Sequence, residues 1–62
     1  MPITPAQMIK RLKQEGFEEV SQKGSHLKMR NEKTGKQVIV PMHSKDLPTG
    51  TEKAILKQAG LL

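Results

Sequence analysis

Apolar residues recur at helical spacing near both ends of the chain and alternate with polar residues between them. Before the first helical pattern, Thr4 and Gln7 can form a capping box, and Pro5 suits the first helical position. Gly16 supplies a left-handed residue that ends the pattern, so a helix is predicted over about residues 5–15. Its buried face is expected to hold Met8, Ile9 and Leu12.

The end of this helix has a counterpart near the other end of the chain. Residues 56–61 (LKQAGL) echo residues 12–17 (LKQEGF), which predicts the same glycine-based helix cap at both places. The second helix is predicted to begin within residues 48–51, with Thr49 and Glu52 as a second capping box. It is expected to bury Ile55, Leu56 and Ala59.

Three short alternating stretches between the helices predict strands joined by two hairpins. The pair Gly24-Ser25 is typical of a two-residue type II′ turn, which places Lys23 opposite His26. A loop at residues 32–35 closes the second hairpin. Both registers put the same apolar residues on one face: Val20, Leu27, Met29, Val38 and Val40. The other face is predicted to hold Lys23, His26, Lys28, Arg30, Gln37 and Ile39.

These elements predict an α+β fold in the order α-β-β-β-α. The strands form a three-stranded antiparallel sheet, and both helices cover its apolar face because that face must be buried. With 62 residues there is room for a single domain, expected to span residues 1–62.

The amino-acid composition excludes several classes of protein and favours others. The chain has no cysteine, which excludes a disulfide scaffold and thiolate metal sites and favours a reducing compartment, the cytoplasm. It has no apolar run long enough to cross a membrane. Eleven Lys and Arg against six Asp and Glu give a net charge of +5, which favours an anionic partner. One Phe and no Tyr or Trp leave little scope for base stacking on aromatic side chains.

One titratable residue stands among the cations of the polar face. His26 follows the first turn, Lys23 lies opposite it, and Lys28 and Arg30 follow along the same strand. Cleavage of a phosphodiester needs cations for the developing negative charge and a group that moves a proton near neutral pH. RNA carries its own nucleophile, the 2′-hydroxyl. The cluster therefore suits RNA cleavage, with the three cations binding phosphate and with neither a metal nor a cofactor.

The same residues also have structural interpretations. A lone histidine on a strand is usually a surface residue, and Lys28 can belong to a solvated strand face. Arg30 lies opposite Glu19 in the predicted register, where the two can form a cross-strand ion pair. Ile39 is either an ordinary exposed apolar residue or part of a partner surface.

Three further residues near the cluster remain open in role. Gly24 and Ser25 are preferred turn residues that position the site, and no carboxylate is placed to activate Ser25 as a nucleophile. His43 follows the third strand, where it can assist the reaction, bind phosphate or serve the structure. Its pairing with Asp46 offers too few ligands for a metal site.

Three motifs carry a family resemblance. Residues 23–26 (KGSH), 38–43 (VIVPMH) and 55–61 (ILKQAGL) together resemble the HicA family of toxins from bacterial and archaeal toxin–antitoxin pairs. The resemblance implies a fold like that of double-stranded-RNA-binding domains and a catalytic role for His26. It also implies cleavage of mRNA that arrests translation, and neutralisation by a HicB-type antitoxin protein.

The function expected first is therefore a metal-independent endoribonuclease toxin. The alternative is a non-catalytic RNA-binding module with the same fold, although a full double-stranded-RNA-binding domain spans about 16 base pairs and needs more surface than this chain readily supplies. A basic protein that binds an acidic protein partner is a third class compatible with the charge.

Overall fold

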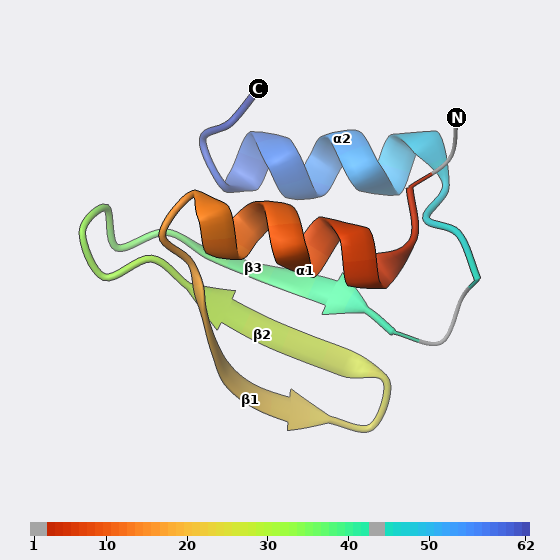
Figure 1. Ribbon diagram of the computed structural model, residues 1–62, viewed down its shortest axis with the longest axis horizontal. Helices are drawn as coiled ribbons and strands as arrows, with labels where there is room; N and C mark the ends of the chain where they lie inside the picture. The colour runs from red at the N-terminus through yellow and green to blue at the C-terminus, as the bar shows by residue number, and fades with distance from the viewer. Residues whose placement is uncertain (1–2, 43–44) are drawn as a thin grey trace.

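Two helices flank three strands in the predicted order. The structure, a computed structural model, describes residues 3–42 and 45–62. Along the chain it contains α1 (Pro5–Gln14), β1 (Glu18–Lys23), β2 (His26–Arg30), β3 (Gln37–Pro41) and α2 (Thr49–Gln58) (Figure 1). The strands form an antiparallel sheet in the order β1-β2-β3. The predicted α+β fold is confirmed.

The start of α1 follows the predicted capping box. The Thr4 hydroxyl accepts a hydrogen bond from the Gln7 backbone N–H (3.2 Å), and the Gln7 side chain accepts one from the Thr4 backbone N–H (2.9 Å). Two backbone donors that the helix itself cannot satisfy are thereby paired.

Both helices end in the same backbone motif. At the end of α1 the Phe17 N–H donates to the Leu12 carbonyl (2.9 Å), and at the end of α2 the Leu61 N–H donates to the Leu56 carbonyl (2.8 Å). The glycine before each donor has a positive φ, 97° and 78°. These are Schellman caps, as the repeated sequence predicts.

The predicted capping box of α2 is wrong. The helix begins at Thr49 itself, so the N-cap residue is Pro48, which makes no side-chain capping bond. Since Thr49 already has helical geometry, its hydroxyl is one position too late to act as the cap. Glu52 remains in the first turn, where its charge is favourable to the helix dipole.

The sheet register follows prediction in the second hairpin and at the tip of the first. Lys23 lies opposite His26, and Met29 lies opposite Val38. Gly24 has φ 59°, and no described non-glycine residue has a positive φ, so only the first turn residue is left-handed. That is the backbone of a type II′ turn, which needs glycine at this position.

The first hairpin departs from prediction at Val20. Glu19 lies opposite Met29 and Ser21 lies opposite Lys28, so Val20 is the extra residue of a β-bulge. The predicted pairing of Val20 with Met29 is therefore wrong. The Val20 side chain is 55% exposed rather than part of the core.

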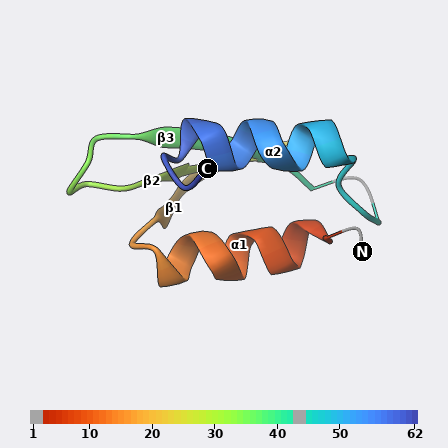
Figure 2. The same cartoon turned by 90° about the horizontal axis from the view of Figure 1, so that it is seen from above.

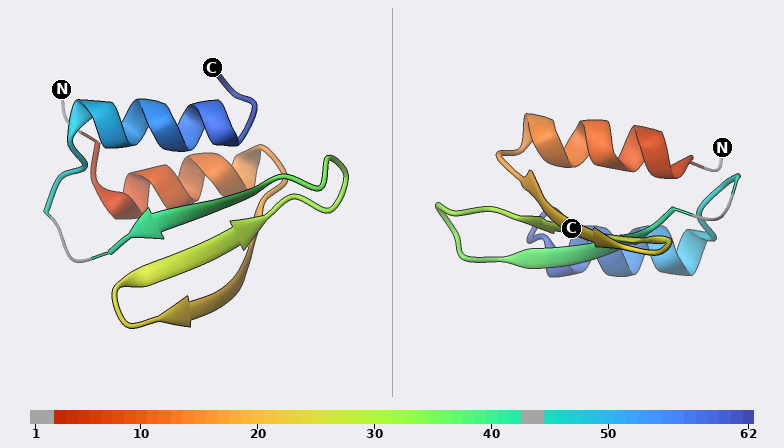
Figure 3. Two further views of the ribbon diagram at one scale, coloured as in Figure 1. Left: turned by 180° about the vertical axis from the view of Figure 1, so that it is seen from behind. Right: turned by 90° about the horizontal axis from the view of Figure 1, so that it is seen from below.

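A single core joins both helices to one face of the sheet. The strands contribute Leu27, Met29, Val38 and Val40. The helices and loops contribute Met8, Leu12, Phe17, Leu47, Ile55, Leu56 and Ala59. Seen from above, α1 lies to one side of the strands (Figure 2). From behind, β3 passes in front of α1, and α2 lies next to β3, beyond that edge of the sheet (Figure 3).

Asn31 is the one buried polar side chain among the described residues, and the sequence pattern did not predict it. Its side-chain amide donates to the Glu15 carbonyl at the end of α1 (3.1 Å). Its carbonyl oxygen accepts from the backbone N–H groups of Lys33 (2.9 Å) and Thr34 (3.3 Å). Asn31 therefore ties the first helix to the loop between β2 and β3.

The two helices have ten residues each, and no helix in the described part of the chain is long and apolar enough to cross a membrane.

Candidate active site

His26 is positioned by the tight turn between β1 and β2. It is the first residue of β2, the central strand, and Lys23, the last residue of β1, lies directly opposite. The Ser25 carbonyl accepts a hydrogen bond from the Met42 N–H just beyond β3 (2.6 Å). The Gln22 side-chain amide donates to the Gly24 carbonyl (3.1 Å). The turn is thus tied to both neighbouring strands, so the position of the His26 backbone is well determined.

The open face of the sheet, the side away from α1 and the core, carries the candidate site. Its residues form cross-strand rows because both pairs of strands are antiparallel. One row runs Lys23, His26 and Pro41, and the next runs Ser21, Lys28 and Ile39. Neighbouring rows are two residues apart along each strand, about 6.6 Å.

These two rows border a shallow hollow of about 710 Å³. Its described lining residues are Ser21, Lys23, Gly24, His26, Lys28 and Ile39. Of these, two are cationic, one is a histidine and none is acidic. The His26 side chain is exposed there, so a ligand on the open face can reach it. An anion in this hollow would meet two lysines and no described carboxylate.

Arg30 lies on the same face but outside the hollow. It occupies a third row, opposite Glu18 on one side and Gln37 on the other. The predicted pairing of Arg30 with Glu19 is wrong because the bulge at Val20 shifts the register by one residue. Glu19 instead forms an ion pair with Lys13 of α1 (2.8 Å).

The structure therefore brings together most of the predicted site. Lys23, Gly24, His26 and Lys28 border one hollow, and Ser25 holds the turn beside it. His43 lies outside the described residues. Sequence reasoning did not assign Ser21 to the site, although its place opposite Lys28 follows from counting back from the turn.

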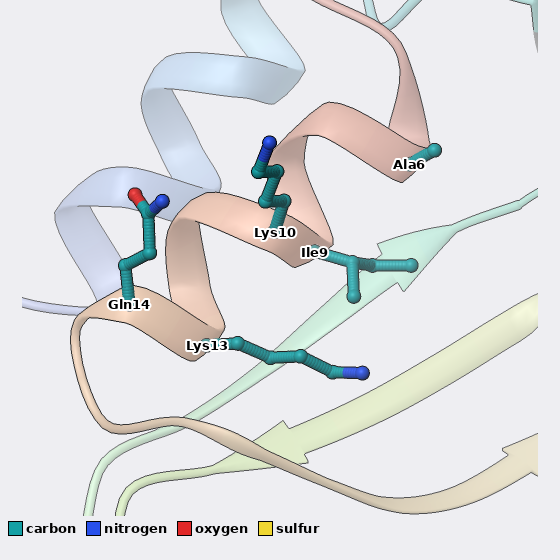
Figure 4. Close-up of a pocket in the computed structure, with 5 residues that line it drawn as sticks. All are labelled: Ala6, Ile9, Lys10, Lys13 and Gln14. Atoms are coloured by element: carbon teal, nitrogen blue, oxygen red, sulfur yellow. The ribbon is translucent and has the colours of Figure 1, made fainter.

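A second hollow, of about 510 Å³, lies on α1 (Figure 4). Its lining is Ala6, Ile9, Lys10, Lys13 and Gln14, all from that one helix. None of these carries an imidazole, a carboxylate or a hydroxyl, so acid–base chemistry is better served by the hollow around His26.

The described residues hold no cluster of metal ligands. Across residues 3–42 and 45–62, no three histidine, cysteine, aspartate or glutamate side chains gather where they could share a metal ion.

Comparison with known protein families shows where the chain belongs. The sequence model of the family described as HicA toxin of bacterial toxin–antitoxin systems matches residues 5–61. No curated protein matches the chain. The match runs from the first residue of α1 to the Schellman cap of α2 and includes the turn, His26 and both lysines of the hollow. The chain therefore belongs to the HicA toxin family of bacterial toxin–antitoxin systems.

Proposed function

We propose that this HicA family toxin is a metal-independent endoribonuclease that cleaves mRNA in the cytoplasm and so arrests translation. The strongest support is the hollow that His26 shares with two lysines. Lys23 lies directly opposite His26 on β1, and Lys28 lies two residues further along β2. A phosphodiester in this hollow meets a proton-transfer group and two cations at once. Membership of a toxin family supplies the biological context for such an activity.

The proposed reaction uses the nucleophile that RNA carries. The ribose 2′-oxygen attacks the adjacent phosphorus, a bond from that oxygen to phosphorus forms, and the bond from phosphorus to the 5′-oxygen of the next nucleotide breaks. The products are a 2′,3′-cyclic phosphate and a free 5′-hydroxyl. One proton leaves the 2′-hydroxyl and one reaches the 5′-oxygen. His26 makes one of these transfers as general base or general acid, and solvent at the open face makes the other.

The lysines have an electrostatic role in this proposal. Negative charge on the non-bridging oxygens increases as the pentacovalent transition state forms, and fixed cations lower the energy of that state more than that of the substrate. Lys23 is held at the end of β1 by the hairpin, and Lys28 lies in the middle of β2. Arg30, one row further along, would bind a neighbouring phosphate of the strand.

The proposed regulator is a HicB-type antitoxin protein. A toxin–antitoxin family implies a partner that silences the toxin. Covering the open face would remove His26 from solvent, and an acidic contact surface would complement Lys23 and Lys28. This is the most direct way to block so shallow a site.

The reaction class is tested with purified protein and single-stranded RNA. We expect cleavage in the presence of EDTA, fragments that end in a 2′,3′-cyclic phosphate, and complete resistance of a bond whose 5′ nucleotide carries 2′-deoxyribose. Cleavage of the deoxy-substituted bond, or loss of activity in EDTA, would instead indicate attack by water with a metal ion. RNA binding without any cleavage would leave the non-catalytic RNA-binding module as the function.

A further inference from the structure

Ile39 is an apolar side chain in the middle of a polar face. It lies on β3, its side chain is 42% exposed, and it borders the hollow beside Lys28. Two other large hydrophobic side chains among the described residues are exposed, Val20 and Leu62, and neither borders the hollow. An exposed apolar residue within a binding site commonly marks an apolar part of the ligand.

Ile39 and His26 are separated by about the span of one nucleotide. Ile39 lies directly opposite Lys28, and His26 lies opposite Pro41 two residues further along β3, so the two are diagonal neighbours. Diagonal neighbours in a sheet have backbones about 7–8 Å apart. In a nucleotide the ribose separates base and phosphate. A base resting on Ile39 therefore leaves the adjoining phosphate near His26 and Lys28.

No phenylalanine, tyrosine or tryptophan side chain lines this site to hold a base. The single residue of these three types in the chain is Phe17, which is 2% exposed in the core. Apolar side chains can replace aromatic ones against the flat face of a base. The branched Ile39 side chain is stiff at χ1, which makes it a defined surface. Ser21, at the opposite end of the same row, adds a hydroxyl that can bond to a base edge or a ribose.

We propose that Ile39 is a positioning residue that seats one unstacked base of single-stranded RNA and thereby holds the adjoining phosphodiester over His26. In a duplex both faces of each base are covered by its neighbours, so only an unpaired, unstacked base can rest on Ile39. The substrate class is therefore single-stranded RNA or an unpaired loop. This inference rests on the proposed ribonuclease function.

The test combines a change in the RNA with a change in the protein, Ile39→Ser, and uses one control variant. A single-stranded oligoribonucleotide containing one mapped cleavage site is compared with versions in which one of the two nucleotides flanking that site is abasic. We expect the wild-type protein to lose on the order of 10-fold in kcat/KM on one abasic version. Ile39→Ser should lose a similar factor on the intact oligonucleotide and no more than about 2-fold further on the abasic one, because both changes remove the same contact. Val20→Ser, an exposed valine outside the hollow, should behave as wild type.

Equal losses on the abasic oligonucleotides in wild type and Ile39→Ser would overturn the inference, since the base would then rest elsewhere. Unchanged cleavage by Ile39→Ser together with weaker antitoxin binding would assign Ile39 to the protein partner instead. Neither result would touch the proposed ribonuclease function, which fails instead if the wild-type protein binds RNA without cleaving it.

Discussion

At the residue scale, the site depends on the alternation of side chains along one central strand. Alternation places His26 and Lys28 on the open face and Leu27 and Met29 in the core. The sequence alone predicts this alternation along β2, because a two-residue turn determines which residue lies opposite Lys23. The hollow itself was not predictable in the same way, since it requires β1, β2 and β3 to lie side by side in one register. Ile39 belongs to the site only through that third strand.

The first prediction concerns the two lysines of the hollow. Lys23→Ala/Lys28→Ala should weaken RNA binding and make it less dependent on salt, lowering the slope of log affinity against log salt by about 1 to 1.5, since each contact to a single strand contributes about 0.7. Stability should change by less than about 0.5 kcal/mol because both side chains are exposed. The matched control is Lys53→Ala/Lys57→Ala on α2, with the same charge change at exposed positions that do not line the hollow. Equal slopes for the two double variants would place the RNA elsewhere.

At the element scale, the sequence predicts those features that depend on a few neighbouring residues, such as helix ends. The capping box at Thr4 and both glycine caps are read from short motifs and are confirmed. The bulge at Val20 has no such motif, because β-branched Val20 suits a regular strand as well as a bulged one. Glu19 reaches Lys13 on α1 in the bulged register, a long-range contact that no local pattern reveals.

The second prediction separates the predicted from the observed register of β1. Val20→Ala should change the free energy of unfolding by less than about 0.5 kcal/mol, because the side chain is 55% exposed. Val38→Ala, the same change at 1% exposure, should cost about 1–3 kcal/mol through lost burial and a cavity. Urea unfolding of both variants measures the difference. If Val20→Ala lowered the free energy of unfolding as much as Val38→Ala, the Val20 side chain would lie in the core, as the regular register predicts.

The third prediction concerns the buried polar tie between α1 and the second hairpin. Asn31→Ala should lower the free energy of unfolding by about 1–3 kcal/mol, since it removes three hydrogen bonds at a site 6% exposed. Gln37→Ala, at an exposed position near the same loop, serves as the control and should be nearly neutral. Thermal unfolding distinguishes the two, and an unchanged midpoint for Asn31→Ala would mean that the tie does not stabilise the fold.

At the scale of the whole molecule, the two sides of the sheet have separate tasks. One side packs against α1 and, at the β3 edge, against α2 to form the core, and the other side carries the hollow and its cations. Chains of this size bury only about 60% of their unfolded surface, so stability is marginal. The proposed catalytic and RNA-binding side chains are exposed on the open face, outside that core, so they can be substituted without unfolding the protein.

The fourth prediction concerns the antitoxin. If a HicB-type partner covers the open face, the His26 ring signals in an NMR spectrum should shift on complex formation, and the complex should weaken as salt is raised, because acidic groups meet Lys23 and Lys28. Ring signals that stay unchanged in a saturated complex would mean that the antitoxin silences the toxin from another surface.

The central claim is that His26 transfers a proton during RNA cleavage, and its most direct test is the cleavage rate of a folded His26→Ala protein. Because the side chain is exposed at the start of β2, the variant should unfold at the wild-type urea concentration while its cleavage rate falls by roughly 10²- to 10⁴-fold. Its affinity for RNA should persist, since Lys23 and Lys28 remain. A His26→Ala protein that is folded, binds RNA and still cleaves at the wild-type rate would contradict the account.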